Sequence, residues 1–402
     1  MGLSREEHQV IERVGDAPML AWTQEWATVN SGTRNLAGVA AMTDLLGEGF
    51  ASLPGDLRFE EPTSVDHVTP DGRVEPLAHG RHLHLTARPS APVQLLFTGH
   101  MDTVYPADHP FQEQRWIDDT TLNGPGVADM KGGLAVLLAA LQAVEATPAA
   151  ARIGYEVVIN SDEETGSLSS AALLARAARG KAAALTYEPA LADGTLAGAR
   201  GGTGNFSLVV RGRSAHAGRN PEEGRNALVA AAALAVRLAD ARAPGLSVNP
   251  AQIEGGSPNN VVPDLAILRV NFRPAAPDMI VAAQAALDAA IAEVSAAHEV
   301  TIELHGRFNR PPKPIDPGAD RLFALVKGAG ADLGLTIGWR ATGGVCDGNN
   351  IAAAGVPVVD TMGVRGGAIH SADEFLLVDS LAERAALSAV TILRLADGGL
   401  AA

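Results

Sequence analysis

Residues 153–188 read IGYEVVINSDEETGSLSSAALLARAARGKAAALTYE, and this stretch decides the fold class. IGYEVVINS is an apolar run typical of a buried strand, SLSSAALLARAARG has the periodicity of a helix, and AAALTYE is a second apolar run. We expect Ser167 to be the N-cap of the helix. A strand, a helix and a strand in succession predict parallel strands, because a parallel connection needs a long crossover.

The same alternation continues on both sides of this stretch. Residues 1–52 are predicted to be helical, RHLHLTA and PVQLLFTGH to be strands, and MKGGLAVLLAALQAVEA to be a buried helix. Helix and strand patterns of this kind resume at Asp320 and continue to the end of the chain. The sequence therefore predicts an α/β fold in which helices sandwich a mostly parallel sheet.

The segment between residues 200 and 311 has a different texture. After a Gly-rich start, strand and helix patterns follow in a βαββαβ-like order, which is typical of a compact, ferredoxin-like α+β unit. The proline-rich PPKPIDPG closes the segment. We therefore predict a discontinuous catalytic domain, residues 1–199 and 312–402, with a smaller domain inserted at 200–311.

Composition and charge exclude several partners and kinds of site. The 402 residues carry a formal net charge of −15, which disfavours nucleic acid and anionic membranes as partners. We expect no apolar stretch of the about 20 residues that span a bilayer. The N-terminus lacks an apolar signal core, so we expect a cytoplasmic protein. Cys346 is the only cysteine, so any metal must be held by His, Asp and Glu.

Potential metal ligands follow apolar strands in Gly- or Ser-containing loops. The loops are FTGHMDTV with His100 and Asp102, GPGVADMKGG with Asp129, INSDEETGS with Glu163 and Glu164, LTYEPA with Glu188, and GGAIHSADEF with His370. Parallel sheets place their sites at the carboxyl ends of strands, so these loops can converge. Two imidazoles and several carboxylates suit zinc without thiolates. Asp129, after a Gly-Pro-Gly turn, is well placed to bridge two metals.

These motifs, in this order, resemble the signature of the dinuclear zinc exopeptidase and deacylase family. That family includes glutamate carboxypeptidase, aminoacylase, acetylornithine deacetylase and succinyl-diaminopimelate desuccinylase, and the chain is closest in type to the first. The resemblance spans about residues 95–375 and puts the inserted segment where the family has its dimerisation domain. It implies a homodimer with two Zn²⁺ per chain, replaceable by Co²⁺, that acts on small peptides or N-acyl amino acids.

The resemblance also implies a metal-binding role for one residue of each motif. His100 and Glu188 would complete one zinc site, and Glu164 and His370 would complete the other. Asp129 would bridge the two ions and would be followed by a cis peptide bond.

Three further residues would act in catalysis. Asp102 would orient His100, because carboxylates commonly hold metal-bound imidazoles in place. Glu163 would be the general base, taking a proton from a metal-bridging water and passing it to the leaving amine. His216 in RGRSAHAG would stabilise the oxyanion in the active site of the other subunit.

Substrate contacts are predicted for three residues. Arg310 in FNRPPKP resembles the arginine that glutamate carboxypeptidase uses for the terminal carboxylate, and Asn260 in SPNNVVP resembles a second substrate-side contact. Arg365, five residues before His370, either pairs with a side-chain carboxylate of the substrate or only neutralises carboxylates of the site. Cys346 in TGGVCDGNN is expected to be a buried wall residue.

His82 and His84 in RHLHLT lie two apart on one predicted strand. HxH can bind a metal, but no carboxylate is near them on this strand. We expect this pair to face solvent.

The predicted function is that of a zinc-dependent, carboxypeptidase-type exopeptidase that cleaves an amide next to a C-terminal Glu or Asp. Folate-type glutamates and poly-aspartate fragments would fit this description. An N-acyl amino acid deacylase, of the acetylornithine deacetylase or aminoacylase type, and a dipeptidase are alternatives. A non-catalytic binding protein of the same fold is disfavoured because Glu163 and every expected ligand are present. In a mononuclear or redox enzyme the bridge at Asp129 would be superfluous.

Overall fold

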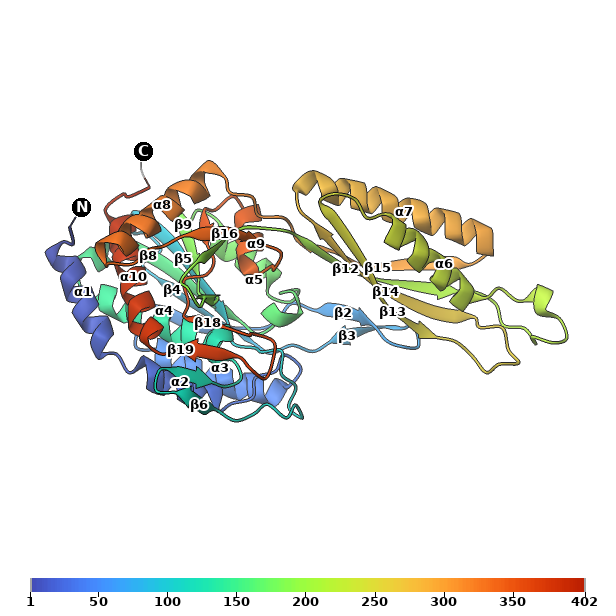
Figure 1. The fold of residues 1–402 in the computed structure, drawn as a ribbon, viewed down its shortest axis with the longest axis horizontal. Helices are drawn as coiled ribbons and strands as arrows, with labels where there is room; N and C mark the ends of the chain where they lie inside the picture. Colours follow the sequence, from blue (N-terminus) through green and yellow to red (C-terminus); the bar gives the residue numbers. More distant parts are fainter. Residues whose placement is uncertain (1, 401–402) are drawn as a thin grey trace.

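A six-stranded sheet forms the centre of the larger lobe in the computed structural model, which describes residues 2–400 (Figure 1). Its strand order is β1-β4-β8-β5-β9-β17. Strands β8, β5, β9 and β17 pair in parallel, and β4 and β1 extend one edge through antiparallel pairs. The strands are β1 (Asp56–Glu60), β4 (His82–Ala87), β5 (Val93–His100), β8 (Ile153–Asn160), β9 (Ala183–Thr186) and β17 (Val358–Val359).

Helices cover both faces of this sheet, which confirms the predicted α/β fold. Successive side chains of a strand point to opposite faces, and Leu95 and Phe97 of β5 join one core while Leu96 joins the other. The helices on the first face are α1 (Arg5–Asp16), α2 (Met19–Ala27), α3 (Leu36–Phe50), α4 (Gly132–Glu145), α8 (Pro317–Asp332) and α10 (Asp379–Ala396). Helices α5 (Ala171–Ala178) and α9 (Asp347–Ala353) cover the second.

The start of α5 differs from the prediction that Ser167 is its N-cap. The helix begins at Ala171, and Ser167 has a positive φ of 55°. Between them the buried carboxylate of Asp162 accepts hydrogen bonds from the backbone N–H of Ser169, at 2.6 Å, and the hydroxyl of Ser170, at 2.7 Å. These bonds hold the chain between Asp162 and Ser170 outside the helix, so α5 starts three residues later than predicted.

A second sheet forms the smaller lobe, which we call the lid. Its strands are antiparallel in the order β13-β14-β12-β15, and α6 and α7 cover one face (Figure 1). The chain order β12-α6-β13-β14-α7-β15 is ferredoxin-like, and the predicted boundaries at 200 and 311 flank it. The elements are β12 (Thr203–Arg211), α6 (Ala227–Asp240), β13 (Leu246–Gly255), β14 (Leu265–Pro274), α7 (Pro277–His298) and β15 (Thr301–Arg310).

Two helices are long and apolar enough to cross a membrane by length and composition alone, Val127–Glu145 and Pro277–His298. This finding corrects the expectation that no apolar stretch has that length. The first contains α4, which is almost wholly buried in the core of the larger lobe. The second is α7, whose Leu287 and Val294 pack into the core of the lid.

A hairpin of β2 (Val65–Val68) and β3 (Val74–Leu77) reaches from the larger lobe to the lid (Figure 1). Val68 packs with Val209 and Ile267 of the lid sheet. Arg269 of β14 donates a hydrogen bond to the carbonyl oxygen of Val68, at 2.8 Å. The hairpin, which the sequence did not predict, therefore connects the two lobes in addition to the chain crossings.

Strand β4 does not face solvent as expected. His82 is buried, and the backbone N–H of Ser161 donates to its Nδ1 at 3.3 Å. His84 lies between Glu60 of β1 and Glu156 of β8, at 3.2 and 2.7 Å. Burial lowers the pKa of His84, but hydrogen bonds to the two glutamates outweigh burial and raise it.

Small sheets complete the larger lobe. One has the order β10-β18-β19-β7-β6, and the other is the parallel pair β11 and β16. The strands are β6 (Arg115–Asp118), β7 (Thr121–Asn123), β10 (Ala190–Leu191), β11 (Leu196–Arg200), β16 (Trp339–Thr342), β18 (Arg365–Gly367) and β19 (Phe375–Leu377).

Candidate metal centre

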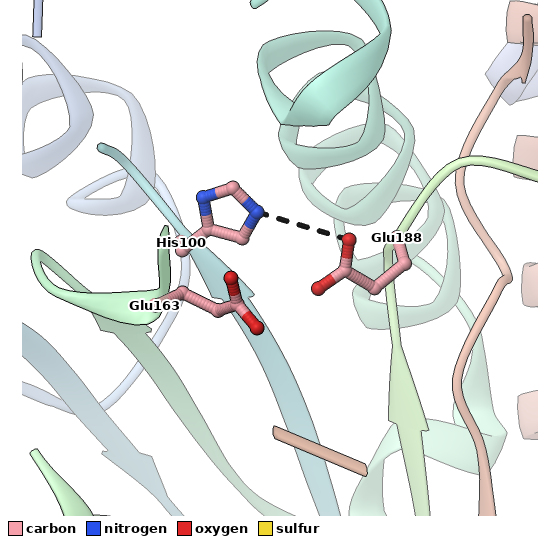
Figure 2. Close-up of side chains that lie close together, drawn as sticks. All are labelled: His100, Glu163 and Glu188. Carbon is pink, nitrogen blue, oxygen red and sulfur yellow. Dashed lines mark ion pairs between the residues drawn. The ribbon is translucent and has the colours of Figure 1, made fainter. Parts of the chain in front are cut away.

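Three of the predicted ligand loops meet at the carboxyl edge of the central sheet. His100 ends β5, a short helical turn with Glu163 and Glu164 follows β8, and Glu188 follows β9. Because β8, β5 and β9 are parallel neighbours, their carboxyl ends lie side by side. Figure 2 shows His100, Glu163 and Glu188 with their polar atoms turned toward one another.

Asp129 lies between the two predicted histidine ligands. Its Oδ1 is 3.1 Å from Nε2 of His100, and its Oδ2 is 3.3 Å from Nε2 of His370. Each carboxylate oxygen therefore faces a different imidazole, which is the arrangement of a bridging ligand. The peptide bond between Asp129 and Met130 is cis, as the resemblance implied.

Each imidazole has a further carboxylate next to it. Oε2 of Glu188 is 3.8 Å from Nε2 of His100 (Figure 2), and Oε2 of Glu164 is 3.2 Å from Nε2 of His370. These are the same pairs that the resemblance implied. One ligand atom each from His100, Glu163 and Glu188 also lie within 4.8 Å of one another. Distance alone therefore allows Glu163 to be a ligand as well as a base.

The buried carboxylates of this site need a cation. Burial and the neighbouring Asp129 raise the pKa of Glu164 to about 7. Hydrogen bonds to Asp129 and Glu164 raise the pKa of His370 to about 10. A divalent cation at this place would balance the carboxylates when the ligands are deprotonated. The nitrogen and oxygen donors fit zinc.

Asp102 holds the His100 ring and the acidic turn together. Its backbone carbonyl accepts a hydrogen bond from Nδ1 of His100 at 2.9 Å, which leaves Nε2 free to face Asp129. Its carboxylate accepts hydrogen bonds from the backbone N–H groups of Glu163 and Glu164, at 3.2 and 3.3 Å. The predicted orienting contact is thus made mainly by the backbone, while the side chain fixes the turn.

Glu374, four residues after His370, is a buried site residue that sequence analysis missed. Its Oε1 accepts hydrogen bonds from the backbone N–H groups of Ala128 and Asp129, both at 3.0 Å. Its Oε2 accepts from the N–H of Gly126 at 3.2 Å. Glu374 therefore connects the loop that carries His370 to the loop that carries Asp129. The only sequence signal was its place in IHSADEF.

A cavity of about 680 Å³ opens over the site, with walls from both lobes. Four of its lining residues are arginines, although the chain is strongly acidic. They are Arg200, Arg273, Arg310 and Arg340. Cys346 is buried and lines the same cavity. Sequence analysis found Arg310 and Cys346 but none of the other three arginines.

Two of the four arginines are engaged with carboxylates of the protein. Arg200 lies 2.7 Å from Asp360. Arg310 is 4% exposed and lies 2.7 Å from Oε1 of Glu163. It also donates to the carbonyl oxygen of Glu163 at 2.9 Å and to the hydroxyl of Ser167 at 2.8 Å. Arg310 therefore holds Glu163 in place at the edge of the cavity.

The other two arginines have no such partner. Within residues 2–400, no carboxylate oxygen lies within 4.0 Å of the guanidinium of Arg273 or Arg340. Arg273 donates from Nε to the Asn271 side chain at 2.9 Å. Burial and the charge of Arg310 lower the pKa of Arg273. Two of the cavity arginines are thus without a close ion-pair partner among the described residues.

Arg365 does not reach the cavity. Its guanidinium lies 2.9 Å from Asp379 and 3.2 Å from Glu383, and it donates to the carbonyl oxygen of Ala192 at 3.1 Å. These contacts turn the side chain toward the start of α10. The expectation that Arg365 contacts substrate is therefore corrected, because carboxylates of the protein already occupy it.

His216 and Asn260 lie together on the lid, away from the metal ligands of this chain. The N–H of Ala217 donates to the carbonyl oxygen of Asn260 at 2.9 Å, and His216 forms a β-bridge with Val261. Neither His216 nor Asn260 lines the cavity. Within one chain, the structure does not bring these two predicted site residues to the metal centre.

Comparison with known proteins agrees with this geometry. Peptidase family M20/M25/M40 matches residues 96–394. Carboxypeptidase G2 of Pseudomonas sp. (strain RS-16) is 31% identical over 316 residues, which are 76% of this chain and 74% of that protein. Succinyl-diaminopimelate desuccinylase of Verminephrobacter eiseniae (strain EF01-2) is 28% identical over 308 residues, 71% of this chain and 75% of that protein.

Solved structures show the same fold over nearly the whole chain. A tripeptidase of Staphylococcus aureus has a TM-score of 0.71 at 23% identity and covers 96% of this chain and 98% of its own. The M20 metallo-carboxypeptidase Sso-CP2 of Sulfolobus solfataricus has a TM-score of 0.69 at 14% identity, with 94% and 98% covered. These matches confirm the resemblance found in the motifs and the hydrolytic character of the enzyme. The chain belongs to peptidase family M20/M25/M40.

Proposed function

We propose that the protein is a zinc-dependent carboxypeptidase that hydrolyses the amide bond before a C-terminal acidic residue. The observation that carries this proposal is the position of Asp129 between His100 and His370, at a cavity where two arginines have no close carboxylate partner among the described residues. The similarity to carboxypeptidase G2 supports the reaction type.

The proposed site holds two zinc ions. His100, Asp129 and Glu188 would bind one, and His370, Asp129 and Glu164 would bind the other. Such a pair polarises the substrate carbonyl and lowers the pKa of water to near 7, so that a nucleophile is available at neutral pH.

Glu163 is the proposed general base. It lies on the cavity wall, its backbone is fixed by Asp102, and its carboxylate is held by Arg310. In this role it removes a proton from the attacking water and delivers it to the nitrogen of the leaving amine. The C–N bond breaks, and a carboxylic acid and a free amine are released.

Arg273 is the proposed partner of the terminal carboxylate. It comes from the end of lid strand β14, faces the like charge of Arg310, and has no carboxylate of the protein beside it. Arginine binds a carboxylate through two parallel N–H donors. A substrate carboxylate there would offset the repulsion between Arg273 and Arg310.

We further propose a homodimer in which His216 and Asn260 of each subunit complete the site of the other. The support is their position on the lid, away from the ligands of their own chain. The lid also has an edge strand, β13, and exposed apolar side chains on α6, Val229 and Val236, at 51% and 64% exposed. An open edge and an apolar helix face suit pairing with a second copy.

A deacylase of N-acyl amino acids is the second candidate. The similarity to succinyl-diaminopimelate desuccinylase favours it, and the same residues would break the same kind of bond. The two candidates differ in what lies on the acyl side of the amide, a peptide or a simple acyl group.

A substrate panel with the zinc-loaded enzyme tests the proposal. The panel pairs peptides and N-acyl amino acids that end in Glu or Asp with the same compounds capped as C-terminal amides. We expect the free acids to be cleaved and the amides to lose about 10- to 150-fold in kcat/KM, the worth of a charge-assisted hydrogen bond. Equal cleavage of capped substrates, or full activity after chelation, would contradict the proposal.

A further inference from the structure

Arg340 lines the cavity from the larger lobe. It belongs to β16, which runs parallel to β11, and it lies in register with Ala197 while Trp339 lies in register with Leu196. Arg340 and Ala197 both line the cavity. The small side chain of Ala197 leaves the space in front of Arg340 open.

The neighbouring Trp339 fixes the direction of Arg340. The Trp339 ring packs against Phe323 of α8, with ring centroids 5.4 Å apart. It also covers Gly198, where an added Cβ would come within 2.5 Å of the ring. Successive side chains of a strand point to opposite faces. With Trp339 held on the α8 side, Arg340 is directed to the cavity.

The charges around Arg340 leave it available for an anion from outside. Hydrogen bonds from Thr195 and the charge of Arg340 lower the pKa of Asp193. The Asp193 carboxylate accepts a hydrogen bond from the backbone N–H of Thr195 and lies farther than 4.0 Å from the guanidinium of Arg340. Of the cavity arginines, only Arg273 and Arg340 lack a carboxylate partner in the described part of the chain. Arg273 belongs to the lid, and Arg340 belongs to the larger lobe.

We propose that Arg340 binds the side-chain carboxylate of the substrate's C-terminal residue and so sets the preference for a dicarboxylic amino acid. This inference rests on the proposed function, in which Arg273 takes the terminal carboxylate. One arginine without a close carboxylate partner comes from each lobe, Arg273 from β14 and Arg340 from β16, and two such cations suit a residue that carries two carboxylates. Arg340 thereby takes the role that the sequence had suggested for Arg365.

The test varies the charge of the substrate side chain and the charge of residue 340 independently and compares kcat/KM for each combination. Ac-Ala-Glu and Ac-Ala-Gln have nearly the same shape and differ by one negative charge. For the zinc-loaded wild-type protein as purified, we expect kcat/KM for the Glu peptide to exceed that for the Gln peptide by about 10- to 150-fold. Arg340→Ala and Arg340→Gln should each bring this ratio close to 1, mainly by slowing the Glu peptide.

Two variants serve as controls. Arg321→Ala removes an exposed arginine of α8 outside the cavity and should keep the wild-type ratio. Arg273→Ala should slow both peptides by a similar factor and preserve the ratio. Zinc content and circular dichroism of each variant show that the fold is intact.

The outcomes separate this inference from the proposed function. If the wild type cleaves both peptides and Arg340→Ala leaves their ratio unchanged, or slows both equally, Arg340 does not read the side chain. The carboxypeptidase assignment would survive that result. If the wild type cleaves no substrate with a free C-terminal carboxylate, both proposals are overturned.

Discussion

The three adjacent carboxylates in SDEETGS make three different kinds of contact. Asp162 accepts hydrogen bonds from Ser169 and Ser170 and shapes the loop before α5. Glu163 pairs with Arg310, and Glu164 faces His370. Like charges are tolerated side by side because each carboxylate has its own partner, and the partner of Glu163 is the cation Arg310.

At the residue scale, Glu163 as general base and Glu164 as metal ligand predict different defects when each is replaced. Glu163→Gln keeps the size of the side chain and removes the proton acceptor, so both zinc ions should stay bound while kcat falls at least about 100-fold. Glu164→Ala should instead lose metal, because it removes the carboxylate beside His370. Elemental analysis alongside kcat distinguishes the two. A Glu163→Gln enzyme whose activity simply follows its metal content would make Glu163 a ligand.

The positions of the candidate ligands were predictable where a motif places them at the end of a strand or shortly after it, as for His100, Glu164 and Glu188. Contacts were not predictable where the partner comes from another element. The carboxylates beside His84 belong to neighbouring strands β1 and β8. The carboxylates that pair with Arg365, those of Asp379 and Glu383, belong to α10. Strand pairing and helix placement decide such contacts, and a linear sequence does not state them.

At the element scale, the β2–β3 hairpin is the least predictable part of the fold. Its strands are four residues each, and its buried Val68 packs on lid strands that lie about 140 and 200 positions later in the chain. By contrast, the central strands and α4 were predictable because their apolar runs are long and continuous.

The docked hairpin predicts a difference between two valines. Val68 is 5% exposed against the lid, and Val74 on β3 is 46% exposed. Val68→Ala should lower the free energy of unfolding by roughly 1–2 kcal/mol through lost apolar burial. Val74→Ala should change it by less than about 0.5 kcal/mol. Denaturant unfolding measures both, and equal effects would mean that the hairpin does not pack on the lid in solution.

At the scale of the whole molecule, both lobes contribute to the cavity. Arg273 and Arg310 come from the ends of lid strands, whereas Arg200 and Arg340 come from the larger lobe. The sequence predicted two domains and their order, since the strand and helix patterns change near residue 200. It did not predict which side chains meet across the gap, because that depends on how the lobes are oriented.

The proposed trans action of His216 predicts complementation between inactive dimers. In a mixed dimer of His216→Ala and Glu163→Gln subunits, one of the two sites has both its own base and His216 of the partner subunit. Random exchange makes half of the dimers mixed, so activity should recover to about a quarter of wild type. The assay is peptide hydrolysis after subunit exchange, with exchange followed by a fluorescent label. Absence of recovery despite complete exchange would place His216 outside the partner's site.

The dinuclear centre is tested most directly by anomalous diffraction at the zinc edge from crystals of the zinc-loaded protein. We predict two peaks per chain, about 3.5–4 Å apart. One should lie among His100, Asp129 and Glu188, and the other among His370, Asp129 and Glu164. A single peak, or two peaks that do not share Asp129, would contradict the proposed site and the chemistry built on it.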